Sequence, residues 1–235
     1  MTASTTPLDL TNWHPPELTS PTSGLAGPID ARGANWRGLT IPNLDLRGAQ
    51  LCRADLRGAD LSQCSLEGAD LRLARYDSQT KTPEDFDLER SGAVGPGAKL
   101  NGAFLNNADL REVDLRGAVL MGAYLSGADL TGGLLDGVSL AGADLRHATL
   151  RGAMCRGTRF GTSQLDMADF RGADLQDASL ESVESIRGAD FSFCTGLEPQ
   201  DVASLLSRNA QELDHWNPLT RGTARISLES LGAKP

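Results

Sequence analysis

The residues that most often carry out catalysis are few in this sequence and badly spaced for it. The three histidines are His14, His147 and His215, and no two of them have the spacing of metal ligands. Gly95 to Lys99 superficially resembles a phosphate-binding loop but lacks the adjacent Gly-Lys-Ser/Thr that such a loop needs. We therefore expect no catalytic residue, no cofactor and no metal, and we expect that the protein is not an enzyme.

The cysteines also argue against a reactive or cross-linked site. Four of them are scattered along the chain with no C-x-x-C pair: Cys52, Cys64, Cys155 and Cys194. In a chain of this length, without signs of export, we expect free thiols that are mostly buried.

Charge restricts the kind of partner that the protein can bind. The 31 acidic and 22 basic residues give a net charge of −9, which disfavours direct binding to nucleic acid or to an anionic membrane because both need clustered Lys and Arg. No stretch approaches the roughly 20 apolar residues of a membrane-spanning helix, and the N-terminus lacks the pattern of a signal peptide. We expect a cytoplasmic protein whose partner presents a basic protein surface.

A repeat of five residues dominates the sequence. Large apolar residues, which we call centres, recur at every fifth position from Leu100 to Leu180, and a small residue stands two places before each centre. The same pattern runs in another register from Trp36 to Tyr76, and a slip of one residue moves the last centres to Ile186 and Phe191. Neither an α-helix nor a simple strand has this period. A chain that turns a corner every five residues does, and four sides close a square coil of about twenty residues whose turns stack at the strand spacing.

The repeated words resemble a known family. Ala54-Asp55-Leu56-Arg57-Gly58 and Ala128-Asp129-Leu130-Thr131-Gly132 are similar to the A-(D/N)-L-x-x signature of pentapeptide-repeat proteins. The resemblance implies an all-β fold, a right-handed quadrilateral parallel β-helix, which is a solenoid with its centres packed inside. We expect the core to include the centres Leu110, Leu130, Leu150 and Phe170.

The period also divides the chain into five segments. Two repeat blocks, 34–76 and 100–195, are separated by an inserted loop at 77–99, where the period fails and two prolines and several charges appear. We expect the segment 1–33 to be partly disordered or to cap the first coil, and 196–235 to form a short capping helix and a tail. The tail either folds back on the cap or pairs with a second subunit, and the family resemblance favours a homodimer through this C-terminal region.

Two outward-facing sets of residues are candidates for partner binding. Residues twenty apart should stack, which gives a candidate acidic ladder: Asp109, Asp129, Asp169 and Asp190, with Thr149 between them. Its carboxylates would either imitate a run of phosphates or form a solvated face with local Arg partners. Apolar residues at usually polar positions give a candidate docking patch: Phe104, Val119, Tyr124, Leu134 and Met154. This patch would either seat the inserted loop through Phe86 and Leu88 or bind a partner.

The family resemblance supplies a specific functional hypothesis. Members with a defined role often mimic DNA, occupy the DNA-binding surface of DNA gyrase or topoisomerase IV, and protect it from quinolones or other poisons. The sequence is therefore interpreted as a binding protein, with a type II topoisomerase as its first candidate partner and antibiotic or self-resistance as the outcome. The alternative is a structural scaffold for protein-protein interaction that uses the 77–99 loop and an apolar face.

Overall fold

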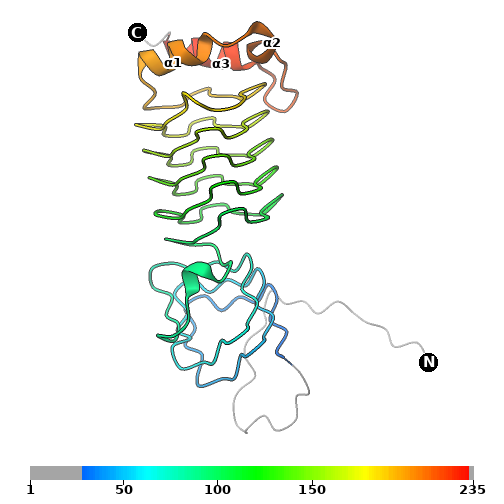
Figure 1. The fold of residues 1–235 in the computed structure, drawn as a ribbon, viewed down its shortest axis with the longest axis vertical. Coiled ribbons are helices and arrows are strands. Elements are labelled where there is room, and N and C mark those ends of the chain that lie inside the picture. Colours follow the sequence, from blue (N-terminus) through cyan, green and yellow to red (C-terminus); the bar gives the residue numbers. More distant parts are fainter. Residues whose placement is uncertain (1–27, 233–235) are drawn as a thin grey trace, which may run out of the picture. The chain divides into compact units, whose positions relative to one another are not determined.

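The computed structural model describes residues 28–232 and shows a right-handed, four-sided parallel β-helix (Figure 1). The chain divides into two compact units, residues 1–94 and 95–235, and each is described by itself. The predicted fold class is confirmed. Of the N-terminal segment predicted as disordered or capping, residues 1–27 lie outside the described part of the chain.

The first unit is a coil whose rungs join residues twenty apart. Parallel bridges connect Asp30 to Gln50 and Gln50 to Asp70 along one side of the coil. Ala31 and Trp36 are fully buried. The coil therefore begins by Asp30, a few residues before the predicted boundary at 34, because Ala31 is too small to be recognised in the sequence as a centre.

The segment predicted as an inserted loop, 77–99, is narrower than expected. Lys81 bridges Asp60 and Val94 bridges Arg75, so the last coil of the first unit is built from part of this segment. Between those two rungs lies a strap, residues 82–90, which contains the 3-10 helix η2 (Leu88–Arg90).

Side chains replace backbone groups where the chain enters this irregular coil. The carboxylate of Asp77 accepts the N–H of Gly58 at 2.9 Å, and the hydroxyl of Thr80 donates to the carbonyl of Leu56 at 2.9 Å. Asp77 also accepts the N–H of Thr80 at 3.0 Å. The Asp77 carboxylate thus takes the part that a backbone carbonyl plays two sides earlier, where Glu67 O accepts the N–H of Gly48.

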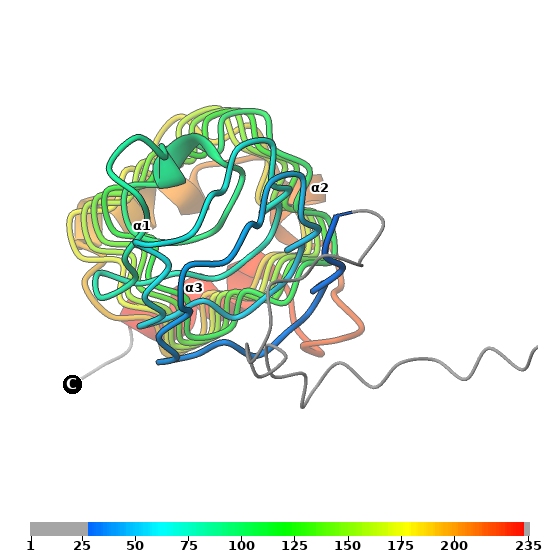
Figure 2. The same ribbon diagram turned by 90° about the horizontal axis from the view of Figure 1, so that it is seen from below.

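The second unit is a regular coil that follows the predicted register. Every centre from Leu100 to Leu180 is at most 3% exposed, and Ile186 and Phe191 are fully buried after the slip. In Figure 1 its rungs stack one above the next, and in Figure 2, seen along the coil, successive turns superimpose around the buried interior. Each coil hydrogen-bonds to the next, as where Leu125 N–H donates to Asp144 O at 2.7 Å.

The corners explain the abundance of glycine. In the regular repeats the residue two places after a centre adopts a left-handed conformation, as at Gly127 with φ of 70°. This conformation is strained for residues with a side chain but not for glycine. The next N–H then closes the turn onto the centre, as from Ala128 to the carbonyl of Leu125 at 2.9 Å.

Three helices cover the C-terminal end of the second unit, namely α1 (Pro199–Leu206), α2 (Ala210–Leu213) and α3 (Ala224–Gly232) (Figure 1). α1 ends at Leu206, and Asn209 then caps α2 by accepting the N–H of Glu212 at 2.9 Å. The tail therefore contributes two further helices to the same cap.

The cap satisfies the last edge of the coil. The Glu212 carboxylate accepts the N–H of Ile186 at 2.7 Å, and the Ser227 hydroxyl accepts the N–H of Phe191 at 3.1 Å. These are N–H groups that a further coil would have bound. Since an open sheet edge leads to association with other chains, these contacts let the coil stop at this point.

The register predicts a sharp difference between inward and outward positions. Leu130 is fully buried, so Leu130→Asp should lower the free energy of unfolding by more than about 4 kcal/mol. Ser126→Asp, at an outward corner, should change it by less than about 0.5 kcal/mol. Chemical denaturation followed by circular dichroism measures both, and equal effects at the two positions would contradict the register.

Candidate binding faces

The coil of the second unit presents four outer faces. On each face the residue just before the centre points outward, and its equivalents stack from coil to coil through parallel bridges. These stacked residues make up the surface that a partner would meet.

The structure brings the predicted acidic ladder together on one face. Bridges join Asp109 to Asp129, Asp129 to Thr149, Thr149 to Asp169, and Asp169 to Asp190. The side chains of Asp109 and Asp129 are 53% and 42% exposed, whereas those of Asp169 and Asp190 are each 8% exposed. Only the first half of the ladder therefore presents carboxylates to a partner.

Arginines on the same face neutralise much of the ladder. Arg111 Nη2 lies 2.8 Å from Asp109 Oδ2, and Arg171 Nη2 lies 2.8 Å from Asp169 Oδ2. Arg151 Nε also reaches Asp169, at 2.5 Å. Burial raises the pKa of Asp169, but hydrogen bonds from Arg171 and Arg151 outweigh it and hold that pKa below its usual range. Asp169 is thus a charged group within a salt-bridge network.

The sequence contained a signal for this neutralisation. Where Asp precedes the centre and Arg follows it, the carboxylate accepts the Arg backbone N–H and binds the guanidinium with both oxygens, as between Asp144 and Arg146. The word D-L-R therefore encodes a local ion pair, in agreement with the alternative interpretation of the ladder as a face with local Arg partners.

Carboxylates without an ion pair lie mainly at the corners. Within residues 28–232, five corner carboxylates of the second coil form no salt bridge: Glu112, Asp136, Asp166, Asp177 and Glu181. The excess negative charge of this unit is therefore distributed around the coil and is not concentrated on the predicted ladder.

The predicted apolar patch is not a single patch. Phe104 and Tyr124 stack on one face, with ring centroids 4.9 Å apart and planes 8° apart. Leu134 bridges Met154 on the opposite face, ten residues and two corners away, while Val119 lies on a third face. The prediction of one patch was wrong because apolar residues were grouped by their position within the repeat, and the face depends on the residue number modulo twenty.

Phe104 and Tyr124 are the most prominent feature that remains. Their side chains stand out from the coil, with exposed fractions of 78% and 45%, and Met121 on the preceding corner is 50% exposed. The predicted loop residues, Phe86 and Leu88, are half-buried and belong to the first unit. Their contact with the patch stays a prediction.

Reactive groups are not assembled elsewhere in the described part of the chain. Residues 28–232 contain no group of three or more His, Cys, Asp or Glu that could hold a metal ion. Cys64, Cys155 and Cys194 are buried free thiols, as predicted, and burial raises the pKa of Cys194 to about 12, so this thiol stays protonated at neutral pH. No helix among these residues has the length and apolarity needed to span a bilayer.

Comparison with known proteins identifies the family. The family description "Pentapeptide repeats (8 copies)" matches residues 30–58, 43–72, 97–127 and 123–161. Together with the coil, this match shows that the chain belongs to the pentapeptide-repeat proteins. No curated protein matches this sequence significantly.

Solved structures of other pentapeptide-repeat proteins are similar to this chain. One, from the Arabidopsis thaliana thylakoid lumen, is 26% identical with a TM-score of 0.41, covering 57% of this chain and 89% of that one. HetL from Nostoc, a protein involved in regulating heterocyst differentiation, is 24% identical with a TM-score of 0.26, covering 73% and 94%. QnrB1, a plasmid-mediated fluoroquinolone resistance protein, is 18% identical with a TM-score of 0.40, covering 86% and 90%.

The Asp169 network predicts a pH-dependent stability. Replacing Arg151 and Arg171 together by Ala leaves a buried carboxylate uncompensated. The free energy of unfolding at pH 7 should therefore fall by roughly 1 to 3 kcal/mol. The lowered pKa of Asp169 stabilises the fold above the unfolded pKa of about 3.9, and this stabilisation is lost as the pH falls through the folded pKa. The difference between variant and wild type should therefore shrink near pH 3.

Urea unfolding at the two pH values measures this effect. Arg159→Ala is the control, because Arg159 is exposed and forms no ion pair among residues 28–232. A constant difference from pH 7 to pH 3 would show that the two arginines act through packing alone.

Proposed function

We propose that this protein acts by binding a protein partner on the outer faces of its second unit, without catalysing a reaction. Side chains fill the interior of the coil, with every centre from Leu100 to Leu180 buried, so a ligand would have to be bound outside. The protein would carry out this role in the cytoplasm.

The observation that carries the proposal is the exposed stack of Phe104 and Tyr124. Large aromatic side chains supply much of the binding energy at protein interfaces. They are also costly to leave in water at positions where the repeat most often places a polar residue such as Asp or Ser. Because these two rings lie on consecutive coils of one face, a partner can cover both at once.

Truncating both rings tests this proposal. The double substitution Phe104→Ser and Tyr124→Ser should abolish recovery of a partner from a cell extract while leaving the thermal unfolding temperature within a few degrees. Asn106→Ala, an exposed polar change on the corner after the same side, should leave recovery unchanged. A partner that is recovered equally with all three proteins would remove this face from the proposal.

A type II topoisomerase is the second, more specific candidate. The net charge of −9 and the unpaired corner carboxylates, among them Asp136 and Asp166, support a surface that imitates DNA. The ladder of Asp109 to Asp190 gives this candidate less support, because arginines neutralise much of its charge. In this candidate function the protein protects DNA gyrase or topoisomerase IV from antibiotics or other poisons.

A gyrase supercoiling assay, run with and without a quinolone, distinguishes the candidates. A DNA mimic should inhibit or protect at micromolar concentration, and its effect should fall steeply as salt rises, because charge contacts are screened. An apolar contact through Phe104 and Tyr124 should barely respond to salt. If the protein neither inhibits the enzyme nor protects it from the quinolone, the topoisomerase is excluded as the partner.

A homodimer through the C-terminal region stays part of the proposal. The cap exposes three large apolar side chains, Trp216, Leu219 and Ile226, with exposed fractions of 55%, 73% and 58%. A second copy that covers them would bury this apolar surface. Sedimentation analysis of the purified chain would show whether it is a monomer or a dimer.

A further inference from the structure

Two adjacent sides of the first unit, at Asp70 and at Ser65, lack the next strand that the coil geometry calls for, and the pocket described below lies at the Ser65 side. Along this side the regular pairing is visible one coil earlier. There Leu46 N–H donates to Ser65 O at 2.9 Å, Gly48 N–H donates to Glu67 O at 2.9 Å, and Ser65 N–H donates to Leu44 O at 3.1 Å. A further strand on the same side should therefore make the equivalent three hydrogen bonds, one coil later.

The corresponding groups one coil later are unused. Among residues 28–232, no backbone or side-chain group hydrogen-bonds to the N–H of Leu66, the N–H of Gly68 or the carbonyl of Cys64. The coil is paired on the two sides that flank this gap, at Lys81 with Asp60 and at Val94 with Arg75. The strap between them, residues 82–90, forms no parallel bridge with the coil before it.

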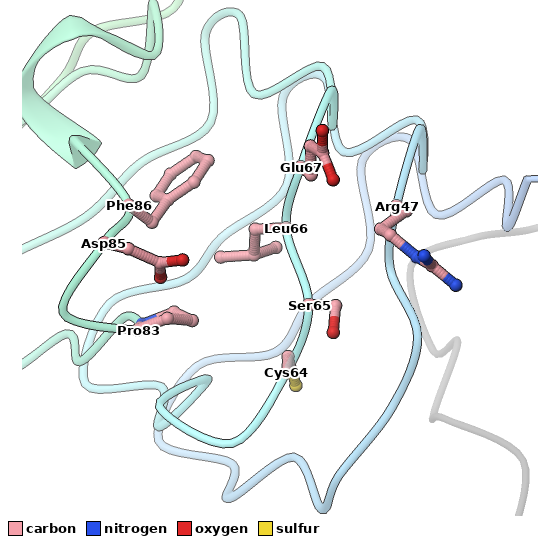
Figure 3. A pocket seen from close by; sticks show the side chains of 8 residues that line it. All are labelled: Arg47, Cys64, Ser65, Leu66, Glu67, Pro83, Asp85 and Phe86. Carbon is pink, nitrogen blue, oxygen red and sulfur yellow. The ribbon is translucent and has the colours of Figure 1, made fainter.

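The strap encloses a pocket over the unused strand. The pocket has a volume of about 380 Å³ and is lined by residues of the strand and of the strap, together with Arg47 from the coil before (Figure 3): Cys64, Ser65, Leu66, Glu67, Pro83, Asp85 and Phe86. Figure 3 shows Pro83, Asp85 and Phe86 on the strap, facing Leu66 across the pocket. Unpaired backbone groups inside a hollow of this size can bind an extended chain.

We propose that this pocket binds an extended peptide segment of another protein, which supplies the missing strand. The peptide residue over Ser65 would donate its N–H to Cys64 O and accept from Leu66 N–H, and the residue two places on would accept from Gly68 N–H. These contacts repeat the bonds that Ser65 and Glu67 make with the coil before them.

The register also fixes the side chains that the peptide should carry. The peptide residue between the two hydrogen-bonded ones lies over Leu66, which is only 2% exposed, so its side chain points inward beside Pro83 and Phe86 and should be apolar. Its neighbours point outward because side chains alternate along a strand.

Charge selects basic residues at the outward positions. Within the described residues, Glu67 and Asp85 line the pocket and form no ion pair. Arg47 is held by Asp45, with Nη2 2.6 Å from Oδ2. Two free carboxylates and a compensated arginine favour a peptide that alternates Lys or Arg with apolar residues.

This site differs from the surface in the proposed function. Phe104 and Tyr124 belong to the second unit, whereas every residue that lines this pocket belongs to the first. Loss of one binding activity therefore leaves the other to be measured.

Hydrogen exchange of the full-length protein first tests whether the edge is open. By nuclear magnetic resonance, the amides of Leu66 and Gly68 should exchange at least about tenfold faster than those of Leu46 and Gly48, which are paired. Equal protection of the two pairs would mean that the edge is already covered, and it would overturn the proposal.

A peptide titration then tests the ligand. The probe is a capped, fluorescently labelled peptide of alternating lysine and valine, and the control peptide has the same length with proline at the central positions, which removes strand N–H groups. Anisotropy should show binding of the first peptide alone, and its addition should slow exchange at Leu66 and Gly68. No binding at roughly 1 mM, or binding without this protection, would overturn the proposal.

Charge variants distinguish the pocket from general attraction to an acidic protein. Glu67→Gln together with Asp85→Asn should weaken binding of the probe by about tenfold, while Glu84→Gln, an exposed change on the strap outside the pocket lining, should not. Equal weakening by both would show nonspecific charge attraction and contradict the assigned site.

Discussion

The hydrogen bond between one coil and the next is the interaction on which the rest of the structure depends. Leu125 N–H reaches Asp144 O at 2.7 Å, and Asp144 N–H reaches back to Ala123 O at 2.9 Å. Because this pairing requires each residue to lie directly over the one twenty places before it, centres stack on centres and form a continuous buried column. The same requirement places every outward residue in a fixed position on one of four faces.

Three of the places where this pairing stops differ in what meets the open edge. At the C-terminal end, Glu212 and Ser227 of the cap accept N–H groups that a further coil would have bound. At the entry to the strap, Asp77 supplies a carboxylate in place of a backbone carbonyl. Along Cys64 to Gly68 no group in the described residues does so, and a pocket lies there instead. An unsatisfied edge in an otherwise paired coil is therefore the natural point at which to seek a bound chain.

Electrostatics follows from the same geometry. An Asp before a centre and an Arg after it are two residues apart at the end of one side, so the local shape of the repeat brings their charges together, as at Asp144 and Arg146. Much of the acidic character counted from the sequence is used in this way. A partner of the proposed kind would meet the remainder, which includes corner carboxylates such as Asp136 and the aromatic pair of Phe104 and Tyr124.

The sequence by itself determined the coil, its register and its buried centres, because a period of five is a local pattern repeated many times. It also indicated a capping helix within residues 196–235. Only the tertiary structure decided that Phe104 and Leu134 lie on opposite faces, that Arg151 of the neighbouring coil also binds Asp169, and that the strap leaves the strand at Leu66 without a partner. These features depend on which residues meet across coils and corners, and the local pattern that specifies each repeat does not contain that information.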